Sequence, residues 1–501
     1  MRIFAIIIHV VWGLMMLPAT LFSSDVYVTK SDVLIGEPST EEIIAALHNS
    51  RHANTVFSDS ALFPALGFDG MPNQVALGFD GVGGRFYTIQ QPESSVRYGL
   101  HARGMQPRAD WLLYGSMSVH QQQDTAVEWV AQSSMLLNQP YQWADSSAAD
   151  WTRRGVQLSG ALLTPQFRSS GWRGALKLYH LVEQGATRQD PRPLYRHARY
   201  GIRLGMNTSS EPQGTIGWFI GYSNAVEESE IGVFSTTNPR VFYIRGLATV
   251  SVANVVRATR NWSESRYETG FSLRKNNLQA SVELRYNEQD NQDGIGSPVF
   301  AGSLRRFELA ADGRIGLRTS SSLHLHSQLA YSEGTDPLFG QVNVNMMGLN
   351  NVMTYHRRFE QTRYLRSFSV TTGHRLITNE DIVGFASYDI HHLLYGFYAV
   401  LDSFETNSDL NLTLGVSGSE KVHGEYIRQR ENFFTRAVSD HQVAYMMASF
   451  MELKLLASYT TVFATQTVQF QVGGRHAIVT RSDTLNSVSR TYLSGRVTLL
   501  F

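Results

Sequence analysis

The chain has 501 residues, with 43 Lys and Arg against 43 Asp and Glu, and it contains no Cys. The charge balance argues against a nucleic-acid binder, which usually carries a basic excess, and the lack of Cys excludes a disulfide-stapled fold and a thiolate zinc site. Hydrophobic residues make up 43% of the chain, enough to bury a core, so intrinsic disorder is not expected.

The first segment has the pattern of an export signal. Arg2 precedes an apolar run over residues 3–17, which ends at Pro18. The run is shorter than the roughly 20 residues that a membrane-spanning helix requires, so residues 1–24 are predicted to be a secretory signal peptide. An uncleaved N-terminal anchor is the alternative. No Cys follows the run, which excludes a lipid-anchored lipoprotein.

Residues 25–84 are predicted to form a periplasmic arm or a plug segment, with one short helix over residues 41–48. The hexapeptide Ala-Leu-Gly-Phe-Asp-Gly occurs twice, at 65–70 and at 76–81. Asp-Gly pairs supply the positive φ angles of tight turns, so two turns are expected. A cation bound by Asp69 and Asp80 is the alternative, although the ligand spacing of a calcium loop is absent.

Downstream of this segment, apolar residues recur at every second position. Residues 278–287 alternate strictly, and residues 305–318 and 323–329 follow the same pattern. A period of two indicates β-strands with one apolar and one polar face. No run beyond residue 25 approaches the length of a membrane-spanning helix, so helical spanning is excluded. A soluble β-sandwich would share this period.

Strand length and the spacing of the links favour a membrane barrel over a sandwich. Many alternating stretches exceed the about five or six residues of globular strands. The link over 319–321 is a tight turn, whereas 288–303 and 333–351 read as long polar loops. Outer-membrane barrels have short periplasmic turns and longer extracellular loops. The sequence therefore predicts a periplasmic turn at 319–321 and an extracellular link over 290–297.

The last ten residues carry the most specific signal. Apolar side chains alternate there, and the chain ends on an aromatic residue. Such a final strand resembles the targeting signal of bacterial outer-membrane barrels, and an ordinary amphipathic edge strand is the alternative. The residues assigned to this assembly signal are Leu493, Val497, Leu499 and Phe501.

These patterns together predict an all-β fold, a closed antiparallel transmembrane β-barrel over residues 85–501 in the cell outer membrane. We expect about 14–18 strands. The barrel must close because lipid cannot satisfy the backbone groups of an open sheet edge.

Short motifs resemble a family of uncharacterised outer-membrane β-barrels from Bacteroidota. They are Gly174–Tyr179, Arg188–Pro193 and Ile202–Met206, while Asn49 and Asn54 resemble the start of that family. The resemblance implies the location and the fold, and it transfers no catalytic residue.

Charged residues on the polar strand faces are the candidate functional residues. Charge on the lipid face would cost about 2–4 kcal/mol per Arg near the midplane, so these side chains are expected inside the barrel. Their mixed signs predict a structural charge ladder or a polar solute path. The lumen-facing candidates are Glu283, Arg285, Glu308, Asp312, Arg314, Arg318, His324 and His326.

No catalytic, cofactor or metal site is predicted. His324 and His326 share a strand face, but the sequence places no third or fourth metal ligand beside them. Nucleophile-elbow, phosphate-loop and His-Glu-x-x-His motifs are absent from the sequence. The neighbours Asp440 and His441 are expected on opposite faces of a strand, and so is the pair at 391–392. An outer-membrane hydrolase assembled from distant strands is kept as a third alternative.

The function predicted first is passive or partner-assisted passage of a small solute. The alternative is a plugged barrel that acts as a surface binding protein, an adhesin or a component of an envelope complex. The aromatic stretch 137–151, with Tyr141, Trp143 and Trp151, suits a pore lip or contact with carbohydrate or protein. Expected partners are outer-membrane lipid, the barrel-insertion machinery and periplasmic or lipoprotein partners, with no nucleic acid. A large plugged transporter of roughly 22 strands would need a longer chain.

Overall fold

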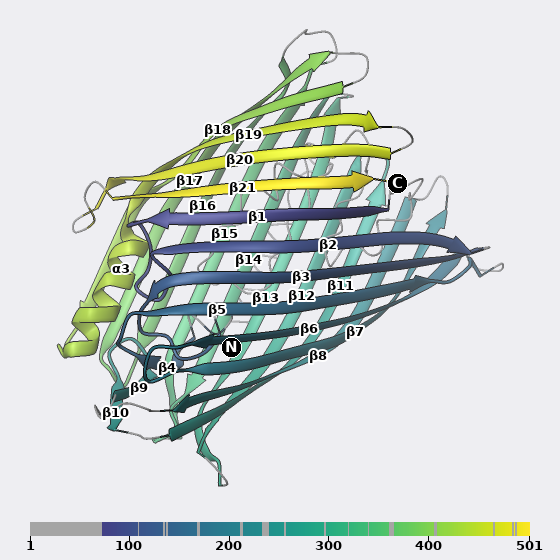
Figure 1. Cartoon of the computed structure of the whole chain (residues 1–501). Helices are drawn as coiled ribbons and strands as arrows, with labels where there is room; N and C mark the ends of the chain where they lie inside the picture. Colours follow the sequence, from purple (N-terminus) through teal and green to yellow (C-terminus); the bar gives the residue numbers. More distant parts are fainter. Residues whose placement is uncertain are drawn as a thin grey trace.

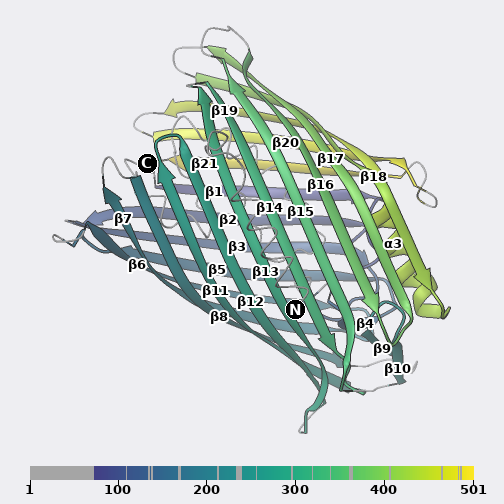
Figure 2. The same cartoon turned by 180° about the vertical axis from the view of Figure 1, so that it is seen from behind.

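The alternating stretches of the sequence form a closed antiparallel barrel of 18 strands in a computed structural model (Figures 1 and 2). The predicted fold class is thus confirmed. The structure describes residues 73–500 apart from 109, 134–135, 137–138, 168–170, 211–213, 233–239, 255–256, 295–296, 319, 339, 360–364, 405–407, 464–465, 483–484 and 486–487. The predicted signal peptide, the helix at 41–48, the first hexapeptide and Phe501 lie outside the described residues.

Each barrel strand pairs with its neighbours along the barrel wall. The barrel strands are β1 (Gln74–Gly84), β2 (Ser94–Arg108), β3 (Trp111–Val127), β5 (Ala149–Leu163), β6 (Trp172–Thr187), β7 (Leu194–Ser210), β8 (Gly214–Gly232), β11 (Arg257–Lys275), β12 (Leu278–Asp293), β13 (Val299–Arg318), β14 (Ser321–Thr335), β15 (Val342–Arg358), β16 (Leu365–Asp381), β17 (Ala386–Phe404), β18 (Ser408–Arg428), β19 (Ser449–Phe463), β20 (Gln466–Arg481) and β21 (Ser489–Leu500).

The ring closes where β1 pairs with β21, from Gln74 opposite Leu500 to Gly84 opposite Arg490. This closure removes the free sheet edges that lipid could not hydrate. It also corrects two predictions. The barrel begins at Gln74, inside the segment assigned to the arm, and the second hexapeptide is strand instead of turn because both its neighbours pair with it.

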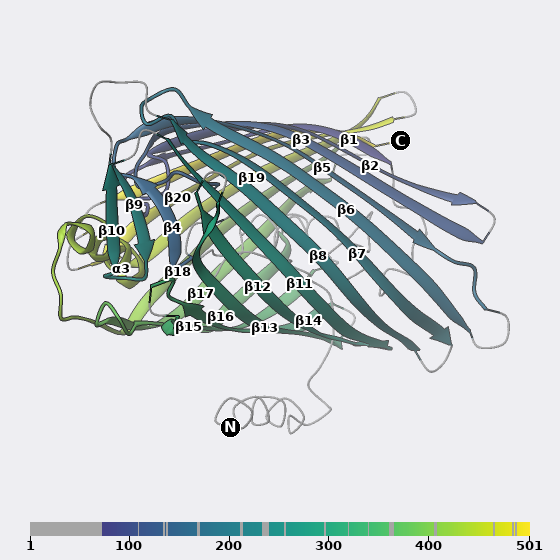
Figure 3. The same ribbon diagram turned by 90° about the horizontal axis from the view of Figure 1, so that it is seen from below.

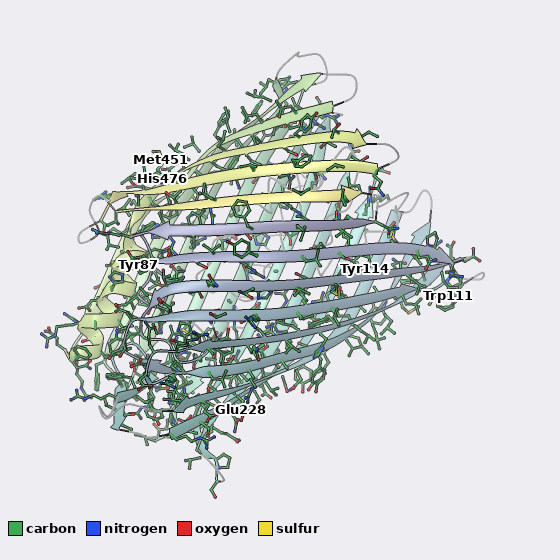
Figure 4. All side chains as sticks on the ribbon, in the orientation of Figure 1. Tyr87, Trp111, Tyr114, Glu228, Met451 and His476 are labelled. Atoms are coloured by element: carbon green, nitrogen blue, oxygen red, sulfur yellow. The ribbon has the colours of Figure 1, made fainter. Side chains whose placement is uncertain are left out.

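The two ends of the barrel differ in their links. We call the end at Gln74 and Leu500 the terminal end, and the opposite end the loop end. At the terminal end β11 and β12 are joined by Asn276 and Asn277 alone, with Asn276 at a φ of 51°. Figure 4 shows Trp111 and Tyr114 towards the terminal end and Tyr87 at the loop end.

The long links are at the loop end, and they are not the ones predicted. The polar stretches at 288–303 and 333–351 are mostly strand, since β12 runs to Asp293 and β14 to Thr335. The long links instead follow β3, β8 and β18. They hold β4 (Tyr141–Asp145), β9 (Arg240–Arg245), β10 (Val250–Asn254), the π-helix η5 (Thr435–Ser439) and the helix α3 (Asp440–Met447). No helix in the described part of the chain is long and apolar enough to cross a membrane.

The two faces of the barrel wall have opposite character. On β12, Val282 and Leu284 are 45% and 36% exposed, whereas the alternating Glu283 and Arg285 are 6% and 7% exposed. The same reversal on the other strands gives an outer surface of exposed large apolar side chains, such as Leu77, Tyr98, Leu178, Phe271, Phe397, Leu455 and Val472. A closed barrel that is apolar outside and polar inside is the architecture of outer-membrane proteins, and this chain is located in the outer membrane.

Candidate functional site

Three long links fold together at the loop end. The strands β4, β9 and β10 form a small antiparallel sheet in the order β10-β9-β4, and η5 and α3 lie beside it (Figure 3). We call the described residues of the β3–β5, β8–β11 and β18–β19 links the end cap. The end cap therefore joins segments that are far apart along the chain.

An aromatic core holds the end cap together. Trp129, Phe242 and Phe434 come one from each link and are buried, with Ala144, Ile244 and Val438 around them. The ring centroids of Trp129 and Phe242 are 4.7 Å apart, and those of Trp129 and Phe434 are 5.8 Å apart. Truncating a buried aromatic side chain typically costs about 3–5 kcal/mol, so the three links stabilise one packed unit.

The end cap also packs on inward-facing residues of the wall. Leu247 and Ala248 lie against Ile377, Tyr388 and Ile390 of β16 and β17. The ring of Tyr141 lies over Gly302 and Gly334 on β13 and β14, where an added Cβ would come within 2.7 Å of the Tyr141 side chain at both positions. Glycine at these two positions leaves room for the ring.

The contacts continue along the wall to β19, β20 and the link that follows β1. Tyr445 of α3 packs with Phe86, Phe450 and Val479, and His441 Nε2 lies 3.1 Å from the carbonyl oxygen of Tyr87. On the other side of the ring, the backbone N–H of Ser133 in the β3–β5 link donates to Glu227 of β8 at 3.0 Å. The end cap therefore lies across the loop end of the lumen.

Asp381 is the main polar anchor between the end cap and the wall. Its carboxylate accepts hydrogen bonds from the backbone N–H groups of Ala248 at 2.9 Å and Gly384 at 2.7 Å, and from the Thr249 hydroxyl at 3.3 Å. Arg245 of β9 pairs with Asp336 at 3.4 Å. Removing one partner of such buried groups leaves the others unsatisfied, which makes these contacts costly to break.

Two groups of the end cap have shifted pKa values. Burial raises the pKa of Tyr141, so its hydroxyl stays protonated and donates to Asn343. Burial also raises the pKa of Asp145 to about 6, against the opposing hydrogen bonds from Ser147 and Ser146. Asp145 therefore titrates near neutral pH inside the end cap.

The aromatic stretch 137–151 does not form an exposed contact surface. Tyr141, Trp143 and Trp151 are 2%, 1% and 1% exposed, because the first two belong to the end cap and the third to the inner face of β5. The prediction of a carbohydrate or protein contact by these three residues is therefore wrong.

The acid–His pair lies on a helix, contrary to the strand prediction. Asp440 begins α3 and pairs with Arg428 Nη1 at 2.6 Å, while His441 contacts Tyr87. Both side chains hold loops in place, and they do not face one another as a catalytic pair would.

One group of predicted lumen residues belongs to a charge ladder on β7, β11, β12 and β13, with β8 between β7 and β11. Arg285 Nε donates to Glu283 at 2.7 Å, and Arg285 Nη1 lies 3.5 Å from Glu308. The sequence analysis did not predict the further members of this group. We define the charge ladder as Arg203, Glu268, Glu283, Arg285, Arg306 and Glu308, in which Arg203 pairs with Glu268 and Glu283 and Arg306 pairs with Glu308.

The second group lies nearer the terminal end. Asp312 is 2.7 Å from His326 Nδ1 and 3.7 Å from His324 Nε2, and Arg314 stands opposite His324 in register. Arg318 is opposite Ser321, and its side chain lies outside the described residues. No group of three or more His, Asp or Glu in the described residues is arranged to hold a metal ion.

The assembly-signal residues line the seam. Leu493, Val497 and Leu499 are exposed on the outer face of β21, opposite Gly81, Leu77 and Val75 of β1. Their side chains therefore point towards lipid where the barrel closes.

Three solved structures illustrate what the chain is similar to. The ferric preacinetobactin receptor BauA of Acinetobacter baumannii shares 8% identity, with 86% of this chain and 80% of that chain covered and a TM-score of 0.40. The outer membrane transporter YddB of Escherichia coli shares 8% identity, with 86% of this chain and 81% of that chain covered and a TM-score of 0.39. The FrpB iron transporter of Neisseria meningitidis shares 10% identity, with 87% of this chain and 82% of that chain covered and a TM-score of 0.38. Comparison with curated proteins gives no match.

A family model, described as a family of unknown function (DUF6850), matches residues 61–501. The match includes every strand of the barrel.

Proposed function

The chain belongs to DUF6850, a family of unknown function, and we propose that it lets a small polar solute pass through the outer membrane under the control of the end cap. The observation that carries the proposal is the end cap itself, a separately packed unit seated across a lumen with polar walls. Passage requires that this unit move, because the aromatic core and the Asp381 anchor hold it in place.

The wall of the lumen supports passage over chemistry. Many of its buried charged residues are engaged in ion pairs, such as Arg153 with Asp124 at 2.7 Å and Arg260 with Asp293 at 2.6 Å. Groups held this way stabilise the wall. Ser419 Oγ lies 2.6 Å from His392 Nδ1, but both side chains are buried and His392 Nε2 lies 2.8 Å from the carbonyl oxygen of Met446, so this pair is engaged within the packed wall. We therefore propose a protein without catalytic activity. Its placement among Bacteroidota barrels stays a prediction from the sequence.

We propose that the loop end faces the outside of the cell, as in outer-membrane barrels with long extracellular loops. Cys introduced at Ser297 and at Ser320 of this Cys-free chain tests this orientation. An impermeant thiol reagent added to intact cells is expected to label Ser297→Cys only, and the reverse pattern would refute the orientation.

Swelling of proteoliposomes in a small neutral sugar tests the passage. We expect slow swelling with the wild type and faster swelling with Asp381→Ala, which frees the end cap. Glu230→Ala is the matched control, because Glu230 pairs at 2.7 Å with Arg257 at the rim, and both residues belong to the wall strands β8 and β11. Equal rates for empty liposomes and Asp381→Ala would contradict the proposal.

Exposed apolar residues at the loop end favour a second candidate, a closed barrel that binds a partner there. Leu338, Phe433 and Phe385 are 71%, 62% and 48% exposed. They lie in links between strands, so their exposure is not explained by the lipid-facing surface of the strands. Exposed apolar patches mark interaction sites. This candidate predicts no swelling with either variant.

A further inference from the structure

Five arginines without ion pairs face the lumen near the terminal end. Strand register places each on the same face as the charge ladder: Arg274, for example, stands opposite Gln279, two alternating positions from Glu283. In the described residues none of these five forms an ion pair with a carboxylate. We call them the basic vestibule: Arg103, Arg173, Arg274, Arg358 and Arg496.

The loop-end half of the lumen wall is arranged differently. Several arginines there pair with carboxylates, as Arg199 does with Glu264 at 3.3 Å and Arg475 with Glu452 at 3.7 Å. Much of the positive charge of that half is thus balanced locally, whereas no described carboxylate forms an ion pair with an arginine of the basic vestibule.

The acidic side chains described near the basic vestibule already have cationic neighbours. Asp312 lies between His324 and His326, and Glu268 and Glu283 belong to the charge ladder. Asp80 acts electrostatically on Arg496. Among the described side chains at this end of the lumen, positive charge therefore predominates.

Arg103 and Arg496 form the tightest part of the basic vestibule. They flank β1, and both act electrostatically on His101, which stands between them. Arg103 stands opposite Gln74 and Arg496 opposite Gly78, and the inward-facing β1 position between these two is Ala76, whose side chain is small. The two guanidinium groups act electrostatically on each other. Arg103 Nε is buried and has no hydrogen-bond partner in the described part of the structure. Bringing like charges together is unfavourable, and the single carboxylate of Asp80 can balance only one of them, so the arrangement suits a bound anion.

We propose that the basic vestibule binds oxyanions and that the solute admitted by this barrel carries a phosphate or carboxylate group. Guanidinium groups bind both in two-pronged hydrogen-bonded pairs, and rings of Arg or Lys line anion-selective pores. The proposal rests on the proposed function only in treating the lumen as the solute path. The chain as a whole has equal numbers of basic and acidic residues, so this polarity is not visible in its composition.

Isothermal titration calorimetry of the purified full-length protein in neutral detergent tests the proposal. The probes are inorganic pyrophosphate, citrate and, as the cation, putrescine. We expect pyrophosphate or citrate to bind and putrescine not to bind. The double variant Arg103→Gln/Arg496→Gln should weaken anion binding by at least about tenfold, because two charge-assisted contacts are lost.

Arg188→Gln, in the exposed β6–β7 link, removes one positive charge and is the matched control for a single vestibule substitution such as Arg274→Gln. Heat-modifiable migration checks that each barrel is folded, and Arg274→Gln supplies a second site if the double variant does not fold. Absence of binding by both anions, or equal binding by wild type and vestibule variants, would overturn the proposal. Anion binding without any swelling of Asp381→Ala liposomes would contradict the proposed function but not the oxyanion site.

Discussion

The carboxylate of Asp381 accepts a 2.9 Å hydrogen bond from the backbone N–H of Ala248, a residue 133 positions away in the sequence. Asp381 is the last residue of β16, and Ala248 lies between β9 and β10. One side chain of the wall thus fixes the turn between β9 and β10 of the end cap. The same carboxylate also accepts a hydrogen bond from the backbone N–H of Gly384.

We expect Asp381→Ala to loosen the end cap without unfolding the barrel. The substitution leaves two buried N–H groups without an acceptor, at a cost of about 1–3 kcal/mol each. Hydrogen exchange should accelerate at the amides of Ala248 and Gly384 and stay slow in β12. Uniform acceleration in all strands would show instead that Asp381 supports the whole barrel.

The stability of the end cap should fall as the pH rises through the range from about 4 to 6. Burial raises the pKa of Asp145 to about 6 in the folded state, from about 3.9 in an unfolded chain, so the folded state binds the proton more tightly. The folded end cap is therefore most favoured below the unfolded pKa and loses up to about 3 kcal/mol once the pH exceeds 6.

Thermal melting followed by tryptophan fluorescence measures this effect, because Trp143 and Trp129 are buried in the end cap. Asp145→Asn should remove the dependence on pH and raise the melting temperature at pH 7.5. Asp150→Asn, at an exposed position of β5, is the control. The same slope in wild type and Asp145→Asn would exclude Asp145 as the titrating group.

Adjacent positions of β14 should respond oppositely to the same substitution. Leu329 stands between Leu309 and Leu349 on the apolar outer face, whereas Gln328 stands between Ala310 and Asn350 on the polar inner face. Leu329→Arg would place a charge towards lipid at a cost of about 2–4 kcal/mol, while Gln328→Arg would meet the lumen. Recovery of heat-modifiable barrel from membranes should therefore fall for the first variant alone, and equal recovery would argue against the assigned faces.

Arg203→Ala should strongly destabilise the barrel. It leaves Glu268 and Glu283 buried without their shared cation, and breaking a buried ion pair from one side costs about 3–5 kcal/mol. Arg203→Ala/Glu268→Ala should recover part of that loss. The urea midpoint in detergent measures both, and a double variant less stable than the single one would contradict the role given to the ladder.

The sequence predicted features that depend on the period of two. The alternation at 278–287 correctly indicated a strand, on which Glu283 and Arg285 are buried, and the predicted short link falls between Arg318 of β13 and Ser321 of β14. These features were predictable because burial on one face imposes a local pattern.

Features set by contacts between distant segments could not be read in the same way. Gln289 and Asn291 made 288–303 look like a loop, yet they are buried strand residues of the inner face. The Asp80–Gly81 pair suggested a turn, but pairing on both sides keeps it in β1. Nothing local marks Arg203 as the partner of Glu268, which is 65 residues away. Tyr141 and Trp143 are buried in the end cap because segments distant in the sequence pack against them.

Single-channel conductance in a planar bilayer tests the account most directly, because it reports whether the lumen opens when the end cap is released. We expect wild-type protein to be closed with rare openings, and Asp381→Ala to stay open for longer at the same unitary conductance. Glu230→Ala should behave as the wild type. A folded Asp381→Ala barrel with no conductance, or a wild type that is fully and steadily open, would contradict a lumen controlled by the end cap.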